Sequence, residues 1–225
     1  MSQKTALLID DEAELLDAFA FAMRLAGFRV RVALNGADAF ELMREEPPHV
    51  VISDVRMPGG SGIELFARVQ ASFSSPPPFV IATGFADLTL ERAYADGIEA
   101  VLIKPFELTE LQATVRRVTT PPAERWMASA ASDDGCAVEL APGAHQVTLG
   151  RGGAFVATFR PPRAGERVRL RLPLRDGDVR GTGIVRWSRV DRVPGCGVEF
   201  VSLAEPAAQA ARLSALRLRA FIPSE

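Results

Sequence analysis

The sequence is poor in the residues that build redox and metal centres. It holds two cysteines and two histidines among 225 residues. Cys136 and Cys196 lie 60 positions apart and have no metal-ligand spacing around them, so we expect two ordinary reduced thiols. His49 and His145 each lack a second nitrogen, sulfur or carboxylate at ligand spacing, and we expect structural or surface roles for both.

Long apolar runs are also missing. No stretch approaches the roughly 18 consecutive apolar residues that a membrane-spanning helix requires. The opening residues MSQKTALLIDDE contain only a short apolar run before three acids, which differs from the longer apolar segment of a signal peptide. From these absences we expect a protein of the cytoplasm.

Lysine is absent from the second part of the chain, which points to two domains. Residues 1–125 contain 12 Lys and Arg against 18 Asp and Glu, a balance of −6. Residues 126–225 contain 14 against 10, a balance of +4, and all 14 cations are arginine. An uneven charge of this kind is typical of two domains of different origin. With 48% hydrophobic residues, both can bury a core.

The first part alternates short apolar runs with stretches of helical period. The predicted strands are Ala6–Ile9, Val30–Leu34, Val50–Ile52, Phe79–Ala82 and Ala100–Ile103. Most are too continuously apolar to be half-exposed, which is typical of parallel sheets covered on both faces. One predicted helix carries an apolar stripe from Leu15 to Ala26 and ends at Gly27, and another runs from Leu108 to Val118. Residues 1–120 therefore predict an α/β domain, doubly wound and flavodoxin-like.

The pattern changes after Thr119-Thr120-Pro121-Pro122, where we expect a linker over residues 121–135. Its residues 123–135 fit either a short helix and a polar loop or an extended chain. Residues 136–225 then predict a small antiparallel β-barrel that ends in a helix, Pro206–Phe221. The predicted strands are Cys136–Leu140, Gln146–Leu149, Ala154–Phe159, Arg167–Leu172, Val179–Ser188 and Cys196–Val201.

Polar side chains follow four of the first five strands. They are Asp10 with Asp11, then Asp54, Thr83 and Lys104. The carboxyl ends of strands in such a sheet collect functional groups. Clustered carboxylates need a cation, and hard oxygen ligands favour Mg²⁺. An aspartate beside that ion can attack phosphorus, and Mg²⁺, a lysine and a hydroxyl can neutralise the phosphoryl oxygens.

At these positions the sequence resembles the response-regulator receiver family, over residues 4–118. The resemblance rests on Asp10-Asp11, Asp54, Thr83, Lys104 and the cis-peptide candidate Pro105, together with the loops Met57-Pro58-Gly59 and Lys104-Pro105-Phe106. It implies a phosphoprotein of a two-component phosphorelay. Asp54 would be the phosphoacceptor, Thr83 the switch hydroxyl and Lys104 the phosphate-pairing amine. Asp10, Asp11, Asp54 and the backbone carbonyl of Arg56 would hold Mg²⁺. The chain departs from the family at Val101, where the family often has Tyr or Phe.

The second part resembles the PilZ domain family over residues 145–203. Thr148–Val156 is similar to its signature loop and following strand, and Gly195–Val201 to the closing strand of its barrel. A generic small barrel of SH3 or OB type is the alternative. PilZ domains typically bind cyclic di-GMP through RxxxR and [D/N]xSxxG. Here Thr148 and Gly150 replace the acid or amide and the serine, and Arg125 is the only arginine between Val118 and Val147. We therefore expect cyclic di-GMP binding to be lost.

The combined prediction is a response regulator rather than an enzyme, because no second catalytic constellation is visible. Its partners would be a sensor histidine kinase or phosphotransfer protein and an unknown downstream protein, with a homodimer that forms on phosphorylation. Two alternatives remain open. One is a genuine cyclic di-GMP effector. The other is a nucleic-acid-binding regulator that uses the arginines of residues 163–175, with Phe155, Phe159 and Trp187 as stacking surfaces. The parity of these three aromatic residues instead places them in the core.

Overall fold

The computed structural model describes residues 3–84, 88–127, 136–137, 147–173, 177–216 and 218–225. The chain divides into two compact units. The first comprises Met1–Leu88 and Ile98–Thr119, and the second comprises Thr89–Gly97 and Thr120–Glu225. The domain boundaries expected from the sequence, at residues 120 and 135, remain predictions.

The first unit is built on a parallel sheet in the order β2-β1-β3-β4-β5. Its strands are β1 (Thr5–Ile9), β2 (Arg29–Ala33), β3 (Val50–Asp54), β4 (Phe79–Thr83) and β5 (Ala100–Ile103). Its helices are α1 (Ala13–Leu25), α2 (Gly36–Glu45), α3 (Gly62–Ser72) and α5 (Leu108–Val118), whereas α4 (Leu90–Asp96) is counted with the second unit. The strand order and the parallel pairing confirm the flavodoxin-like prediction.

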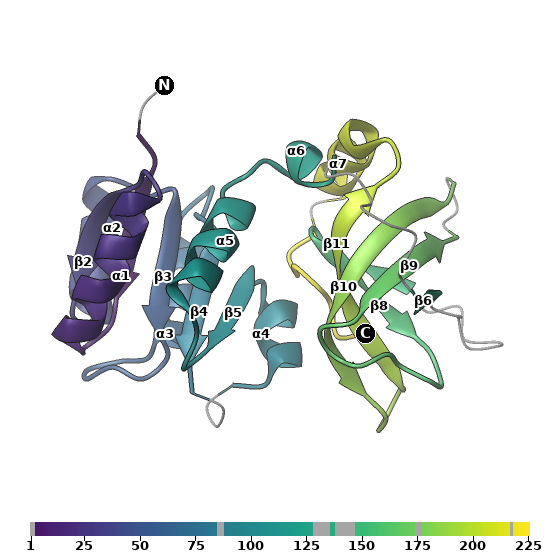
Figure 1. Cartoon of the computed structure of the whole chain (residues 1–225), viewed down its shortest axis with the longest axis horizontal. Helices are drawn as coiled ribbons and strands as arrows, with labels where there is room; N and C mark the ends of the chain where they lie inside the picture. The colour runs from purple at the N-terminus through teal and green to yellow at the C-terminus, as the bar shows by residue number, and fades with distance from the viewer. Residues whose placement is uncertain (1–2, 85–87, 128–135, 138–146, 174–176, 217) are drawn as a thin grey trace. The chain divides into compact units, whose positions relative to one another are not determined.

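Apolar side chains cover both faces of this sheet. Helices α1 and α5 pack against the sheet (Figure 1) and share a core with it. In this core the rings of Phe19 and Phe106 stack with centroids 5.3 Å apart. Helix α3 packs on the sheet through Phe66 and Phe79, whose rings meet edge to face at 5.2 Å. Strand β2 is the exception to the prediction of buried strands: Val32 is 48% exposed, because β2 lies at the edge of the sheet.

The second unit contains a sheet in the order β6-β9-β10-β11-β8-β7. Its strands are β6 (Cys136–Ala137), β7 (Val147–Leu149), β8 (Gly153–Ala157), β9 (Arg167–Leu172), β10 (Val179–Arg189) and β11 (Gly195–Leu203). All described pairs are antiparallel except β6 with β9. In β9 the arginines are exposed and the aliphatic residues buried, as the alternation predicts. The PilZ-like barrel with a C-terminal helix is therefore confirmed. Residues 138–140 and 146 of the predicted strands lie outside the described part.

Two features of the second unit differ from the sequence predictions. The helix expected to reach Phe221 is α7 (Pro206–Ala215), which ends at Ala215. Phe221 and Ile222 are instead buried in a non-helical segment beyond it. The short helix α6 (Pro122–Arg125) begins the expected linker, of which residues 128–135 lie outside the described part. Trp126 directly after it is 1% exposed and meets the Phe200 ring edge to face at 6.0 Å, so this residue belongs to the core.

Among the described residues, no helix combines the length and the apolar composition needed to cross a membrane.

Candidate functional site

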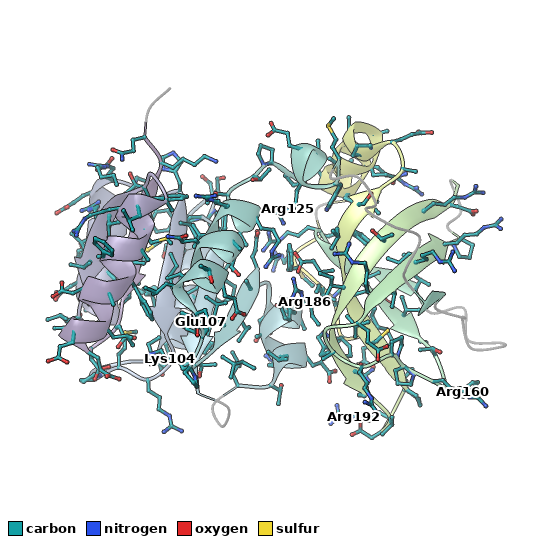
Figure 2. All side chains as sticks on the ribbon, in the orientation of Figure 1. Lys104, Glu107, Arg125, Arg160, Arg186 and Arg192 are labelled. Atoms are coloured by element: carbon teal, nitrogen blue, oxygen red, sulfur yellow. The ribbon has the colours of Figure 1, made fainter. Side chains whose placement is uncertain are left out.

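The strand order brings the predicted site residues to one edge of the first unit. Strands β1, β3, β4 and β5 are consecutive neighbours and run parallel, so their carboxyl ends meet at the same edge. Asp10 follows β1, Asp54 ends β3, Thr83 ends β4 and Lys104 follows β5. Figure 2 labels Lys104 at this edge, where the chain leaves β5.

Lys104 joins the two central carboxylates. Its ammonium donates to Asp10 Oδ2 at 2.8 Å and to Asp54 Oδ1 at 2.6 Å. The Asp10 side chain is 3% exposed, that of Asp54 12% and that of Lys104 23%. Burial alone lowers the pKa of Lys104, but the hydrogen bonds and charges of Asp10 and Asp54 outweigh it and raise that pKa above 10.5. The lysine therefore stays charged, and its ammonium holds the side chains of Asp10 and Asp54 close to one another.

Backbone groups orient both carboxylates. The N–H of Arg56 donates to Asp54 Oδ2 at 2.5 Å, and the N–H of Glu12 donates to Asp10 Oδ1 at 3.0 Å. These bonds leave each carboxylate with one oxygen toward Lys104 and one toward its own loop. Asp11, the neighbour of Asp10, is exposed to solvent.

Thr83 and Lys104 are linked through the backbone. The N–H of Lys104 donates to the Thr83 carbonyl at 2.8 Å, and the Thr83 hydroxyl donates to the carbonyl of Gly84 at 3.1 Å. The Lys104–Pro105 peptide bond is cis, as the sequence motif predicts. Val101 lies in β5 at the position that the receiver family often gives to an aromatic residue.

The oxygen atoms at this edge fit a magnesium ion. Within the described residues, no three His, Cys, Asp or Glu side chains form a group that could hold a metal ion alone. Mg²⁺ needs fewer side chains, since it keeps several waters and binds through one or two carboxylates. Asp10 and Asp54 supply these, with Asp11 and the Arg56 carbonyl close by in sequence.

Gly62 is a residue of this region that the sequence reasoning missed. A Cβ added to Gly62 would overlap the Asp54 carbonyl oxygen and lie 2.7 Å from Ser53 Oγ. The N–H of Gly62 also donates to the Val55 carbonyl at 3.0 Å. Any side chain here would push the Asp54 loop out of place. The available signal was the glycine-rich stretch before a Ser61–Glu64 capping box that starts α3.

The aromatic and arginine residues singled out in the barrel differ in burial and in their contacts. Phe155 and Trp187 are buried and stack at 5.7 Å, as their parity predicts. Phe159 is 68% exposed, so its predicted core position is wrong: β8 ends at Ala157 and alternation no longer applies beyond it. Arg151 donates to the carbonyls of Gly97 at 2.6 Å and Arg219 at 3.3 Å. The Arg151 guanidinium is thus hydrogen-bonded to backbone carbonyls of the protein itself.

Comparison with known proteins agrees with the two-part fold. Residues 6–116 match the response regulator receiver domain family, and residues 136–216 match the PilZ domain family. The transcriptional regulatory protein CrdR of Helicobacter pylori is 32% identical over 116 residues, which cover 51% of this chain and 54% of that protein. The regulatory protein AtoC of Escherichia coli is 34% identical over 112 residues, or 49% of this chain and 24% of that protein.

A solved structure of a putative response regulator from Chloroflexus aurantiacus is 29% identical, covers 52% of this chain and 98% of that one, and has a TM-score of 0.48. The chain spans about half or less of the length of the curated relatives named above.

Proposed function

We propose that this chain, in which a receiver domain precedes a PilZ domain, is a two-component response regulator and that Asp54 is its phosphoacceptor. The observation that carries the proposal is the position of the Lys104 ammonium, within 2.8 Å of Asp10 and 2.6 Å of Asp54. A fixed cation beside two sequestered carboxylates is the arrangement that favours the transfer of an anionic group to one of them.

In the proposed reaction, a carboxylate oxygen of Asp54 attacks the phosphorus of a phosphohistidine on a sensor kinase or phosphotransfer protein. A new O–P bond forms, the P–N bond breaks, and the imidazole nitrogen keeps the electron pair. The Arg56 N–H orients the Asp54 carboxylate for this attack. Lys104 and the Thr83 hydroxyl then face the phosphoryl oxygens. A magnesium ion held by Asp10, Asp11, Asp54 and the Arg56 carbonyl would supply further positive charge.

The PilZ domain provides the output through contacts with a downstream protein. Two observations argue against cyclic di-GMP as its ligand. No RxxxR pair precedes the loop that begins at Thr148, and the guanidinium of Arg151 already binds the carbonyls of Gly97 and Arg219. In this proposal the chain acts in the cytoplasm as a signalling protein without a catalytic output, and phosphorylation changes its dimerisation or the accessibility of its barrel.

Intact-mass spectrometry after incubation with acetyl phosphate and Mg²⁺ tests the phosphoacceptor. The wild-type chain should gain one phosphoryl group, and Asp54→Ala should gain none. Asp17→Ala is the matched control, because Asp17 is an exposed aspartate of the same unit. Equal labelling of wild type and Asp54→Ala contradicts the proposal. Asp11→Ala should fold normally and require a higher Mg²⁺ concentration for the same labelling.

A further inference from the structure

The segment after the last helix is buried although it has no regular structure. We name Leu218–Glu225 the closing segment. Phe221 is 2% exposed and Ile222 is fully buried, and Pro223 is buried as well. Three consecutive buried apolar residues outside a helix or strand mean that this segment occupies a surface shaped to receive it.

That surface is the glycine loop, Thr148–Gly153, which stands where PilZ domains have their [D/N]xSxxG motif. The N–H of Arg151 donates to the Ala220 carbonyl at 2.9 Å, and the N–H of Gly152 donates to the Phe221 carbonyl at 3.0 Å. Two consecutive donors of the loop are thus satisfied by two consecutive carbonyls of an extended chain. The contact has the form of peptide recognition by backbone hydrogen bonds.

The glycines of the loop are necessary for this approach. A Cβ on Gly152 would overlap the Phe221 ring, and one on Gly150 would lie 2.5 Å from the Phe221 carbonyl oxygen and 2.8 Å from that of Ala220. Gly150 is the position where the motif has serine. The substitution that removes a hydrogen-bonding group for cyclic di-GMP therefore also makes room for a peptide backbone.

The Phe221 side chain has defined neighbours. Its ring stacks on Tyr94 of helix α4, in the same compact unit, with centroids 6.2 Å apart and planes at 27°. The Arg151 guanidinium lies over the ring at 5.4 Å. The N–H groups of Phe221 and Ile222 donate to the Tyr94 carbonyl at 3.2 and 3.4 Å. The ring is thus contacted by Gly152, Arg151 and Tyr94.

We propose that the glycine loop is a peptide-binding site for an extended Phe-Ile-Pro segment, and that its resident ligand is the chain's own closing segment. The loop keeps the place of the second-messenger site of the PilZ family but takes a protein ligand. The tether raises the local concentration of this ligand to the millimolar range or above, so the site is filled within the intact chain.

A peptide added in trans tests this site. A variant that ends at Leu218 should bind a fluorescently labelled peptide of residues 218–225, LRAFIPSE, with saturable anisotropy. The full-length chain should bind it at least tenfold more weakly, because its own segment competes. A peptide with Phe221→Ala should lose about tenfold or more in affinity, since the buried ring is lost. In the truncated chain, Gly152→Ala should abolish binding and the exposed-site control Arg160→Ala should not.

The proposal is wrong if the truncated chain folds but does not bind the peptide. It is also wrong if the full-length chain binds the peptide as tightly as the truncated chain does. Binding of cyclic di-GMP but not of the peptide by the truncated chain also overturns it. If the truncated chain does not fold, hydrogen exchange of the full-length chain decides. Phe221→Ala should then lower protection of the Arg151 and Gly152 amides at least tenfold, and unchanged protection contradicts the site. Failure here leaves the Asp54 proposal intact, because no variant touches Asp10, Asp54 or Lys104.

Discussion

Replacement of Lys104 by methionine should destabilise the first unit in metal-free buffer by about 2–3 kcal/mol. The ammonium makes two charge-assisted hydrogen bonds, each worth roughly 1.5–3 kcal/mol. Its side chain is 23% exposed, so solvent screening keeps the total below the sum of the two bonds. Without the lysine, Asp10 and Asp54 also repel one another in a site that excludes most water.

Urea unfolding in EDTA measures this loss. With an m-value of roughly 1.5 kcal/mol/M, the midpoint of the first unit should fall by about 1–2 M. Far-UV circular dichroism follows the helices of both units, of which the longer share lies in the first. Tryptophan fluorescence follows only the second unit, because the two tryptophans of the chain, Trp126 and Trp187, both lie there. The fluorescence transition therefore reveals whether a loss is confined to the first unit.

The matched control is Lys4→Met. Lys4 is the only other lysine, is exposed, and donates to a neutral acceptor, the Thr119 carbonyl, at 2.8 Å. Its replacement should cost about 1 kcal/mol or less. Added Mg²⁺ should restore part of the stability of Lys104→Met, since a cation returns to the carboxylates. A midpoint for Lys104→Met equal to that of Lys4→Met would refute the assigned electrostatic role of Lys104.

Three further predictions follow from the same contacts. Because the pKa of Lys104 is raised in the folded protein, the stabilisation by its charge is fully present below pH 10.5 and is lost as the pH rises through the higher native pKa. The urea midpoints of wild type and Lys104→Met should therefore converge only at strongly alkaline pH. Convergence of the two midpoints at neutral pH would contradict this prediction. Beryllofluoride with Mg²⁺ should change the chemical shifts or the hydrogen exchange of backbone amides mainly between Thr83 and Phe106, although position 101 has valine in place of an aromatic ring. Changes confined to the Asp54 loop would show that the signal of phosphorylation does not pass through residues 83–106. Light scattering on the same samples reports dimerisation. Isothermal titration should show no cyclic di-GMP binding at low micromolar concentration, because several contacts of roughly 1.5–3 kcal/mol each are missing; saturable binding that Arg151→Ala removes would reverse this conclusion.

The first unit could be predicted from its sequence because four of its five strands, all except β2, are short apolar runs that end in or directly precede a polar residue. Ala100–Ile103 has the same bounds in the prediction and in the structure. The sequence order of Asp10, Asp54, Thr83 and Lys104 matches the strand order that brings their elements together. The hydrogen bonds of Lys104 to two carboxylates could not be predicted, since they depend on how the loops return to the sheet.

The second unit was less predictable where tertiary packing overrides local pattern. The composition of Pro206–Phe221 is helical throughout, yet the helix ends at Ala215 and Phe221 packs on the glycine loop. The local sequence does not predict the packing of Phe221, because Gly152, which it contacts, lies far away in the chain. Trp126 was assigned to a linker for the same reason: its partner, Phe200, lies on a distant strand. Only the glycines themselves carried a signal, as positions open to close backbone approach.

Reductive trapping locates the phosphoryl group directly and tests the central claim. Borohydride reduces an aspartyl phosphate to homoserine and releases phosphate, so tandem mass spectrometry of digested protein identifies the modified residue. After acetyl phosphate and Mg²⁺, homoserine should replace aspartate at position 54, and untreated protein should show aspartate there. Trapping at Asp10, Asp11 or another carboxylate, or no trapped residue under conditions in which the intact mass increases, would contradict the assignment of Asp54 as the phosphoacceptor.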